Sequence, residues 1–163
     1  MKYLIANWKA HKTLDDVKDW IKIFKENLSS EFDQTTIILA ASTPHLSFLK
    51  NEIEGLSNVY CSAQSVSDVY DGSYTGEVTA KALEGIASYC IVGHSERRTK
   101  GETQEQIDAQ ISNLKASKIT PILCIRTVDD FPTGYSGIVA YEHPEAIGTG
   151  NNTDVNVVME VFK

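Results

Sequence analysis

The sequence predicts an α/β fold built on a parallel sheet, and three observations support this prediction. Six apolar runs of strand length alternate with segments in which apolar residues recur at helical spacing. The runs are mostly continuous, which is typical of strands buried on both faces of a parallel sheet. The length of 163 residues suits one domain with a sizeable core, and no linker or internal repeat divides the chain.

The expected strands are runs of mostly apolar residues, with short turns or helical segments between them. They are Tyr3–Ala6, Thr36–Ala40, Val59–Ser62, Tyr89–Val92, Ile119–Ile125 and Gly137–Tyr141.

The first two expected helices have recognisable starts. Thr13 with Asp16 resembles a capped beginning, and Thr43-Pro44 opens the second helix with a proline whose missing N–H costs nothing there. Leu14, Val17, Ile21, Phe24 and Leu28 recur at helical spacing in the first helix.

Three more helices are expected further along the chain. Thr79 can cap a short helix that carries Leu83 and Ile86. The inner face of the next is formed by Ile107, Ile111 and Leu114, and a last helix begins with Val155, Val158 and Phe162.

The connection before the last strand is unusually short. Residues Thr127 to Ser136 include Asp129, Asp130, Pro132 and Gly134 and have room for one helical turn at most. A parallel crossover usually needs a dozen or more residues. Periodicity alone therefore leaves two architectures open, an incomplete (β/α) barrel and an open doubly wound sheet.

Composition and charge exclude several classes of function. The net charge of -7 argues against binding nucleic acid through a general basic surface. Neither GxGxxG nor GxxxxGK[ST] occurs, so a nucleotide-binding sheet has no support. No apolar run is long enough to span a membrane, and the first residues lack a full signal-peptide core, so we expect a cytoplasmic protein with no membrane partner.

Metal and disulfide chemistry are also not expected. Cys61, Cys90 and Cys124 are an odd number of widely spaced cysteines, which indicates free thiols in a reducing compartment. The histidines outside the strand ends, His11, His45 and His143, show no metal-ligand spacing, so no metal site is expected.

Polar residues directly follow the expected strands, at the edge where α/β proteins place their sites. Lys9 follows the first strand, His94 the fourth and Glu142 the last. Proton abstraction beside a carbonyl needs a base, an electrophile and a charge that holds an anionic substrate. Glu142, His94 and Lys9 can supply these three functions in that order.

Four segments together resemble the triosephosphate isomerase family. They are ANWK at Ala6–Lys9, YTGEV at Tyr74–Val78, VGHSERR at Val92–Arg98 and AYE…AIGTG at Ala140–Gly150. They occur in the family's order and at roughly its intervals, and the resemblance covers nearly the whole chain. After Glu142 the sequence reads His143-Pro144-Glu145, closer to the archaeal form of the family's mobile loop.

This resemblance implies roles for individual residues. Asn7 and Lys9 would contact substrate, and Glu142 would be the base. His94 would be the electrophile, as a neutral imidazole, which is already known for this family. Glu96 would be a supporting carboxylate near Lys9, although a structural ion pair explains it nearly as well. Gly148 would lie in the mobile loop, and the residues reaching a partner subunit would be Tyr74, Thr75, Gly76 and Glu77.

The resemblance also implies a fold, a reaction and an oligomeric state for the whole molecule. It predicts a TIM-barrel type fold and cofactor-free interconversion of dihydroxyacetone phosphate and glyceraldehyde 3-phosphate, a step of glycolysis and gluconeogenesis, in a homo-oligomer. A full barrel has eight strands and typically about 250 residues, so residues 1–163 are expected to form one domain that lacks the last two βα units. Three explanations stay open: part of a longer or split protein, a short form completed by oligomerisation, or a weak or inactive relative that serves as a binding or assembly module.

Overall fold

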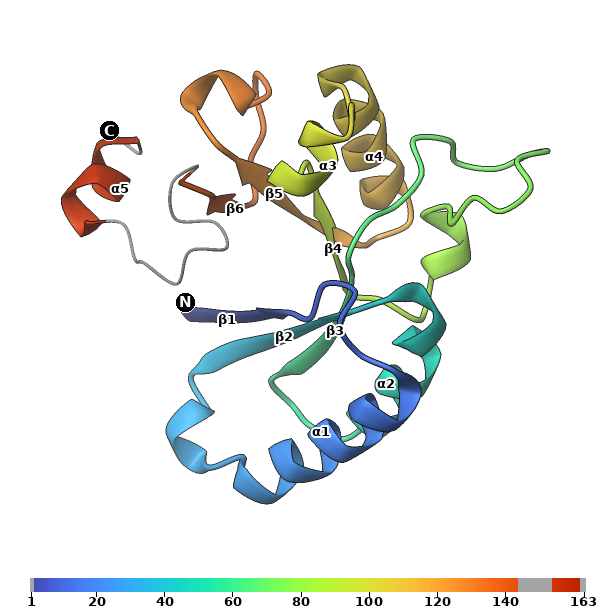
Figure 1. Ribbon diagram of the computed structural model, residues 1–163, viewed down its shortest axis with the longest axis vertical. Helices are drawn as coiled ribbons and strands as arrows, with labels where there is room; N and C mark the ends of the chain where they lie inside the picture. Colours follow the sequence, from blue (N-terminus) through green and yellow to red (C-terminus); the bar gives the residue numbers. More distant parts are fainter. Residues whose placement is uncertain (1, 144–153, 162–163) are drawn as a thin grey trace.

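The computed structural model describes residues 2–143 and 154–161 and contains one curled sheet of six parallel strands (Figure 1). The strands lie side by side in chain order: β1 (Lys2–Asn7), β2 (Thr35–Ala41), β3 (Val59–Ala63), β4 (Tyr89–Val92), β5 (Thr120–Ile125) and β6 (Ile138–Tyr141). The predicted fold class is confirmed as part of a (β/α) barrel. Each predicted strand is present, with ends that differ by at most one residue.

Three of the five α-helices among the described residues cover the outer face of this sheet. The α-helices are α1 (Leu14–Asn27), α2 (Leu46–Glu52), α3 (Ser95–Thr99), α4 (Gln104–Ala116) and α5 (Val155–Val161). Single 3-10 turns are η1 (Ser30–Phe32), η2 (Thr43–His45), η3 (Lys81–Leu83) and η4 (Val128–Asp130). Helices α1 and α2 lie against the β1–β3 half and α4 against the β4–β5 half (Figure 1).

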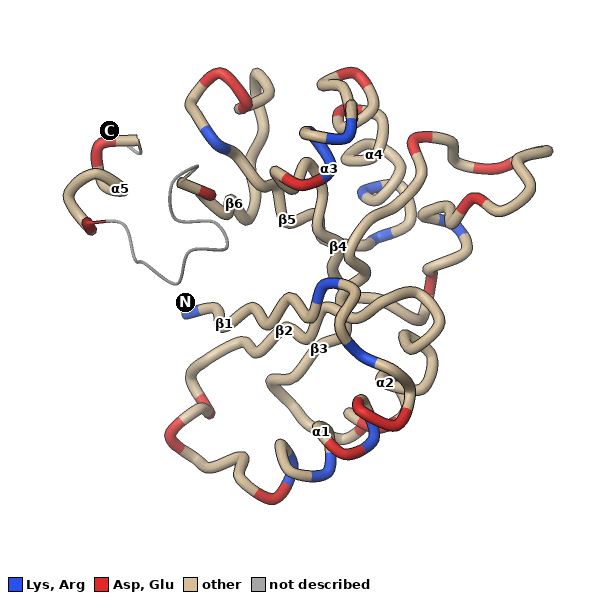
Figure 2. Tube along the Cα trace, in the orientation of Figure 1, with Lys and Arg blue, Asp and Glu red and all other residues tan. Residues whose placement is uncertain are grey.

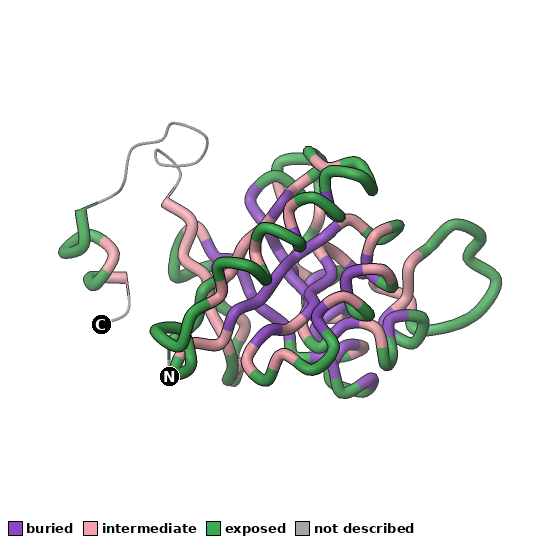
Figure 3. Tube along the Cα trace, turned by 90° about the horizontal axis from the view of Figure 1, so that it is seen from below, coloured by how far each residue is buried: buried purple, intermediate pink, exposed green. Residues whose placement is uncertain are grey.

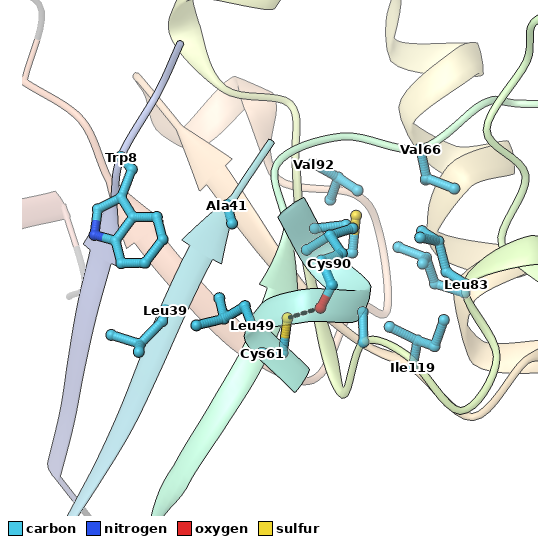
Figure 4. Packing of buried hydrophobic residues seen from close by; sticks show 14 of the residues in the cluster. Trp8, Leu39, Ala41, Leu49, Cys61, Val66, Leu83, Cys90, Val92 and Ile119 are labelled. Carbon is cyan, nitrogen blue, oxygen red and sulfur yellow. Dashed lines mark hydrogen bonds between the residues drawn. The ribbon is translucent and has the colours of Figure 1, made fainter. Parts of the chain in front are cut away.

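Two apolar layers explain why the strands read as continuous apolar runs. In β2, Leu39 and Ala41 pack under the helices, whereas Ile38 and Ala40 pack on the inner face of the curl. Successive side chains of a strand point to opposite faces, so a strand covered on both sides needs apolar residues at every position. Figure 4 shows the outer layer, and buried residues follow the strands in Figure 3.

One predicted helix is wrong in its extent. The hydroxyl of Thr79 accepts the N–H of Ala82 at 3.2 Å, as expected of a cap. The segment that follows is only the 3-10 turn η3, which ends at Leu83, and Ile86 lies beyond it. Glu84, with ψ 131°, already leaves the helical conformation, and Gly85 follows at φ +74° in a turn that the Ile86 N–H closes on the Leu83 carbonyl at 3.0 Å.

The cysteines behave as the sequence predicts. All three are free and buried, and burial raises the pKa of Cys61 to about 12. Such thiols are inert near neutral pH because the thiolate is the reactive form. Of the helices described, none has both the length and the apolar character needed to cross a bilayer.

Candidate active site

The residues after β1 form a tight turn at the carboxyl edge of the sheet. The Trp8 ring is buried against the Trp20 ring at a centroid distance of 4.8 Å. The backbone N–H of Trp8 donates to the Ala40 carbonyl. Lys9 then adopts φ +51°, which is unfavourable for a residue with a Cβ. Local contacts must offset a cost of about 1–3 kcal/mol for such a conformation.

Three polar side chains hold Lys9 in this conformation. The Asn7 carboxamide oxygen accepts the Lys9 N–H at 3.0 Å. The Lys9 carbonyl accepts Gln64 Nε2 at 2.9 Å and the Ser42 hydroxyl at 3.2 Å. Asn7 therefore shapes the lysine turn, whereas its predicted contact with substrate stays a prediction.

The Lys9 ammonium lies beside Glu96, as the sequence resemblance implies. Its Nζ is 2.6 Å from Glu96 Oε1, and the hydrogen bond from Lys9 holds the pKa of the Glu96 carboxyl below its ordinary value. Half of the Glu96 side chain is exposed, so solvent screens the pair and its contribution to stability is small. The pair fixes where the lysine charge stands.

His94 follows β4 and caps the N-terminus of α3. Its Nδ1 accepts the Glu96 N–H at 3.2 Å, so this nitrogen carries no proton. The proton of the neutral ring then sits on Nε2, which lies 2.8 Å from Glu142 Oε1. The helix start thus selects a tautomer whose Nε2–H faces the carboxylate.

Glu142 follows β6, and its carboxylate lies between two donors. Oε1 accepts His94 Nε2 and Oε2 accepts the Ser95 N–H at 2.7 Å. Burial of the side chain, which is 15% exposed, raises its pKa, but the bonds from His94 and Ser95 outweigh burial and lower the pKa. Glu142 is therefore ionised near neutral pH, the form a general base requires.

Gly93 explains why a glycine precedes the histidine. Its φ is +66°, and a Cβ there would lie 2.9 Å from the Arg98 guanidinium and 3.2 Å from the Cys124 carbonyl. Only glycine fits both the backbone conformation and the space.

The structure brings four of the predicted residues to one edge and places others apart. Lys9, Glu96, His94 and Glu142 form a connected set of contacts, which we call the rim cluster. Charged side chains lie on helices and connections, and β2–β6 carry none (Figure 2). Gly148 lies outside the described residues.

The predicted interface loop protrudes from the fold. Its tip is a turn in which the Glu77 N–H bonds the Tyr74 carbonyl at 3.1 Å, with Gly76 at φ +92°. Tyr74 is 53% exposed, and the loop extends away from the sheet between β3 and β4 (Figure 1). Its contact with a partner subunit stays a prediction.

Sequence reasoning missed two contributors to this edge. Gln64 braces the Lys9 turn, and its position directly after β3 could have pointed to it. Asp130 binds Arg126 and Arg98 beside the rim cluster, and no sequence pattern indicates its contact with Arg98. Among residues 2–143 and 154–161 no group of three or more His, Cys, Asp or Glu is placed to hold a metal ion.

The rim cluster suits proton transfer beside a carbonyl. An ionised carboxylate, an imidazole N–H and an ammonium group come from the ends of β6, β4 and β1. The carboxylate can take a proton from carbon, the imidazole can stabilise charge on oxygen, and the ammonium can attract an anion.

Comparisons with known proteins give a consistent result. The family model described as triosephosphate isomerase matches residues 2–134, which include Asn7, Lys9, His94 and Glu96. The triosephosphate isomerase of Trichodesmium erythraeum is 30% identical over 99% of this chain and 76% of its own length. That of Buchnera aphidicola is 33% identical over 93% of this chain and 69% of its own length, and that of Mycoplasmopsis pulmonis is 28% identical over 98% and 75%.

These alignments also show that the chain lacks internal segments that a relative has. The alignment with the Mycoplasmopsis pulmonis enzyme spans 186 positions, more than the 163 residues of this chain, so that relative has internal segments that are absent here. Between β5 and β6, residues 126–137 contain only the turn η4 and no α-helix.

Proposed function

Because the chain belongs to the triosephosphate isomerase family, we propose that it interconverts dihydroxyacetone phosphate and glyceraldehyde 3-phosphate by cofactor-free proton transfer. The observation that carries this proposal is the 2.8 Å contact between His94 Nε2 and Glu142 Oε1, with the Lys9 ammonium at the same edge. Base, hydrogen-bond donor and cation are the three groups that an enediolate mechanism requires.

In the proposed mechanism each side chain acts on a different atom of the substrate. Glu142 removes a proton from the carbon beside the carbonyl and returns it to the neighbouring carbon. His94 donates its Nε2–H to the oxygen on which negative charge develops, and Lys9 attracts the anionic substrate.

Substrate must compete for the proton that His94 now donates to Glu142. The ring has one N–H in its neutral form, and the Glu96 N–H occupies the other nitrogen. Binding of a carbonyl oxygen at Nε2 therefore releases Oε1 of Glu142 for the reacting carbon.

An assay of Glu142→Gln tests the proposal. We expect kcat to fall by about 10²–10⁴-fold, the usual contribution of a general base. Turnover is measured in a coupled assay, and the exposed Glu54→Gln variant, purified in the same way, should keep wild-type activity.

The same preparation of Glu142→Gln also measures background isomerase from the host. Wild-type turnover no greater than that of Glu142→Gln would contradict the proposal. Calorimetry with 2-phosphoglycolate would then show whether the edge still binds a phosphorylated acid, as a non-enzymatic binding module would.

A further inference from the structure

Asp130 is a buried carboxylate that lies outside the rim cluster. It ends the turn η4 and is 8% exposed. Its oxygens accept the Arg126 N–H at 2.9 Å and the Arg126 guanidinium at 3.0 and 3.1 Å. Nη1 of Arg98 lies 3.3 Å from Oδ1 on the other side.

The positive charges of Arg126 and Arg98 keep the Asp130 carboxylate ionised and bound to both side chains. Burial raises the pKa of Asp130, but hydrogen bonds from Arg126 and the Arg98 charge outweigh burial and lower the pKa. Arg98 is itself buried, with 5% of its side chain exposed. Removing one member of such a group leaves another charge buried without its partner.

Through Arg98, Asp130 is connected to the residue before His94. Arg98 Nε donates to the Gly93 carbonyl at 2.8 Å, and the guanidinium lies against the Cα of Gly93. The peptide that leads into the histidine is thus set against an arginine whose other edge faces Asp130.

Through Arg126, Asp130 is connected to the backbone of Glu142. Arg126 follows Ile125, whose carbonyl accepts the Glu142 N–H at 2.8 Å. Strands β5 and β6 are paired up to Ile125 and Tyr141, so Arg126 and Glu142 leave the sheet side by side.

From these contacts we propose that Asp130 is a positioning residue, which sets the distance between His94 and Glu142 by joining the ends of β4 and β5 through two arginines. His94 follows the end of β4. Glu142 follows the end of β6, which pairs with β5. This inference rests on the proposed isomerase activity for its kinetic readout only.

The first test is Asp130→Asn, which keeps the shape of the side chain and removes its charge. We expect kcat to fall on the order of 10-fold or more with KM changed far less, because the reacting groups are misplaced while the lysine that attracts substrate is untouched. The neighbouring exposed Asp129→Asn is the matched control and should leave both constants unchanged.

A second readout needs no turnover. Imidazole ¹⁵N shifts of His94 report its tautomer and the bond to Glu142, and we expect Asp130→Asn but not Asp129→Asn to change them. If wild-type protein has no activity, the isomerase proposal fails while this spectroscopic test still stands.

A milder variant, Arg126→Gln, tests the same connection in case Asp130→Asn does not fold. In Arg126→Gln, whose native side chain is 41% exposed, Asp130 keeps Arg98, and we expect the same His94 shifts to move in the same direction by less. If Asp130→Asn and Arg126→Gln fold, and leave the His94 shifts unchanged, Asp130 is not a positioning residue, even if they lower thermal stability.

Discussion

His94 lies between a strand and a short helix, and each of its two ring nitrogens has a hydrogen-bond partner there. Nδ1 takes the Glu96 N–H and Nε2 faces Glu142, so a backbone group decides which nitrogen keeps the proton. A histidine in an ordinary loop would exchange between tautomers. The chemistry of this side chain is therefore set by the fold immediately around it.

At this scale the lowered pKa of Glu142 predicts a dependence of stability on pH. Its pKa in the folded protein lies below the ordinary value of 4.5, so the carboxylate stabilises the fold above that pH and loses this contribution as pH falls through the folded pKa. At pH 7 we expect Glu142→Gln to lower the free energy of unfolding by on the order of 1.5 kcal/mol.

Urea unfolding of wild type and Glu142→Gln across pH 3 to 7 measures this difference, and other carboxylates cancel because both proteins contain them. The difference should shrink toward acid. A difference that grows as pH falls would mean that the Glu142 charge destabilises the fold.

At the scale of single elements, local sequence determines where the strands lie. Continuous apolar runs predicted β2 and β4 because a strand covered on both faces leaves no position for water. The carboxyl ends of parallel strands meet at one edge of the sheet, and this predicted Lys9, His94 and Glu142 together there. What it could not predict is pairing between residues far apart in sequence.

The missed contacts are of that long-range kind. Gln64 bonds a carbonyl 55 positions away in the sequence, and Arg98 meets Asp130 across two different connections. No local spacing encodes either contact, since each depends on how the sheet curls. Likewise, η3 ends because Glu84 and Gly85 form a turn with Gly85 in a left-handed conformation, which glycine permits but does not impose.

Helix α4 offers a prediction at this scale. The Thr103 hydroxyl accepts the Gln106 N–H while Gln106 bonds back to the Thr103 N–H, a reciprocal cap. This cap begins the helix that buries Ile107 and Leu114 beneath β4 and β5. We expect Thr103→Ala to lower the free energy of unfolding by about 1 kcal/mol.

Thr127 provides the matched control, because it occupies the same position before η4 with no side-chain capping bond. Thr127→Ala should change stability by less than about 0.5 kcal/mol. Chemical denaturation of both variants makes the comparison, and equal losses would show that the Thr103 cap is not the source of the effect.

At the scale of the whole molecule, the curl of the sheet has a consequence for its edges. Each of β2 to β5 has two neighbours, whereas among the described residues β1 and β6 have one each. A closed barrel has no edges, and an uncovered strand exposes a row of N–H and C=O groups that can pair with another chain.

The surface beside β1 is also apolar. Leu4 is 48% exposed on the helix side of β1 and lines a groove of about 410 Å³ with Trp20, Phe24 and Leu28. We propose that this apolar groove beside β1 is where a second copy of the chain binds in the predicted homo-oligomer.

We therefore expect the protein to self-associate and Leu4→Lys to weaken that association. Lysine on an edge strand opposes pairing, and losing a buried leucine side chain from an interface costs about 1.5–3 kcal/mol, which corresponds to roughly a tenfold or larger rise in Kd. Sedimentation velocity over a wide concentration range measures the change, with Val128→Lys, a 61% exposed site in η4, as the control that should associate like wild type.

Because Leu4 is already half exposed, folding should survive the substitution, so a loss of association can be read as an effect on the surface. Wild-type protein that sediments as a monomer at every concentration, or Leu4→Lys that associates as tightly as wild type, would show that the β1 edge does not drive assembly.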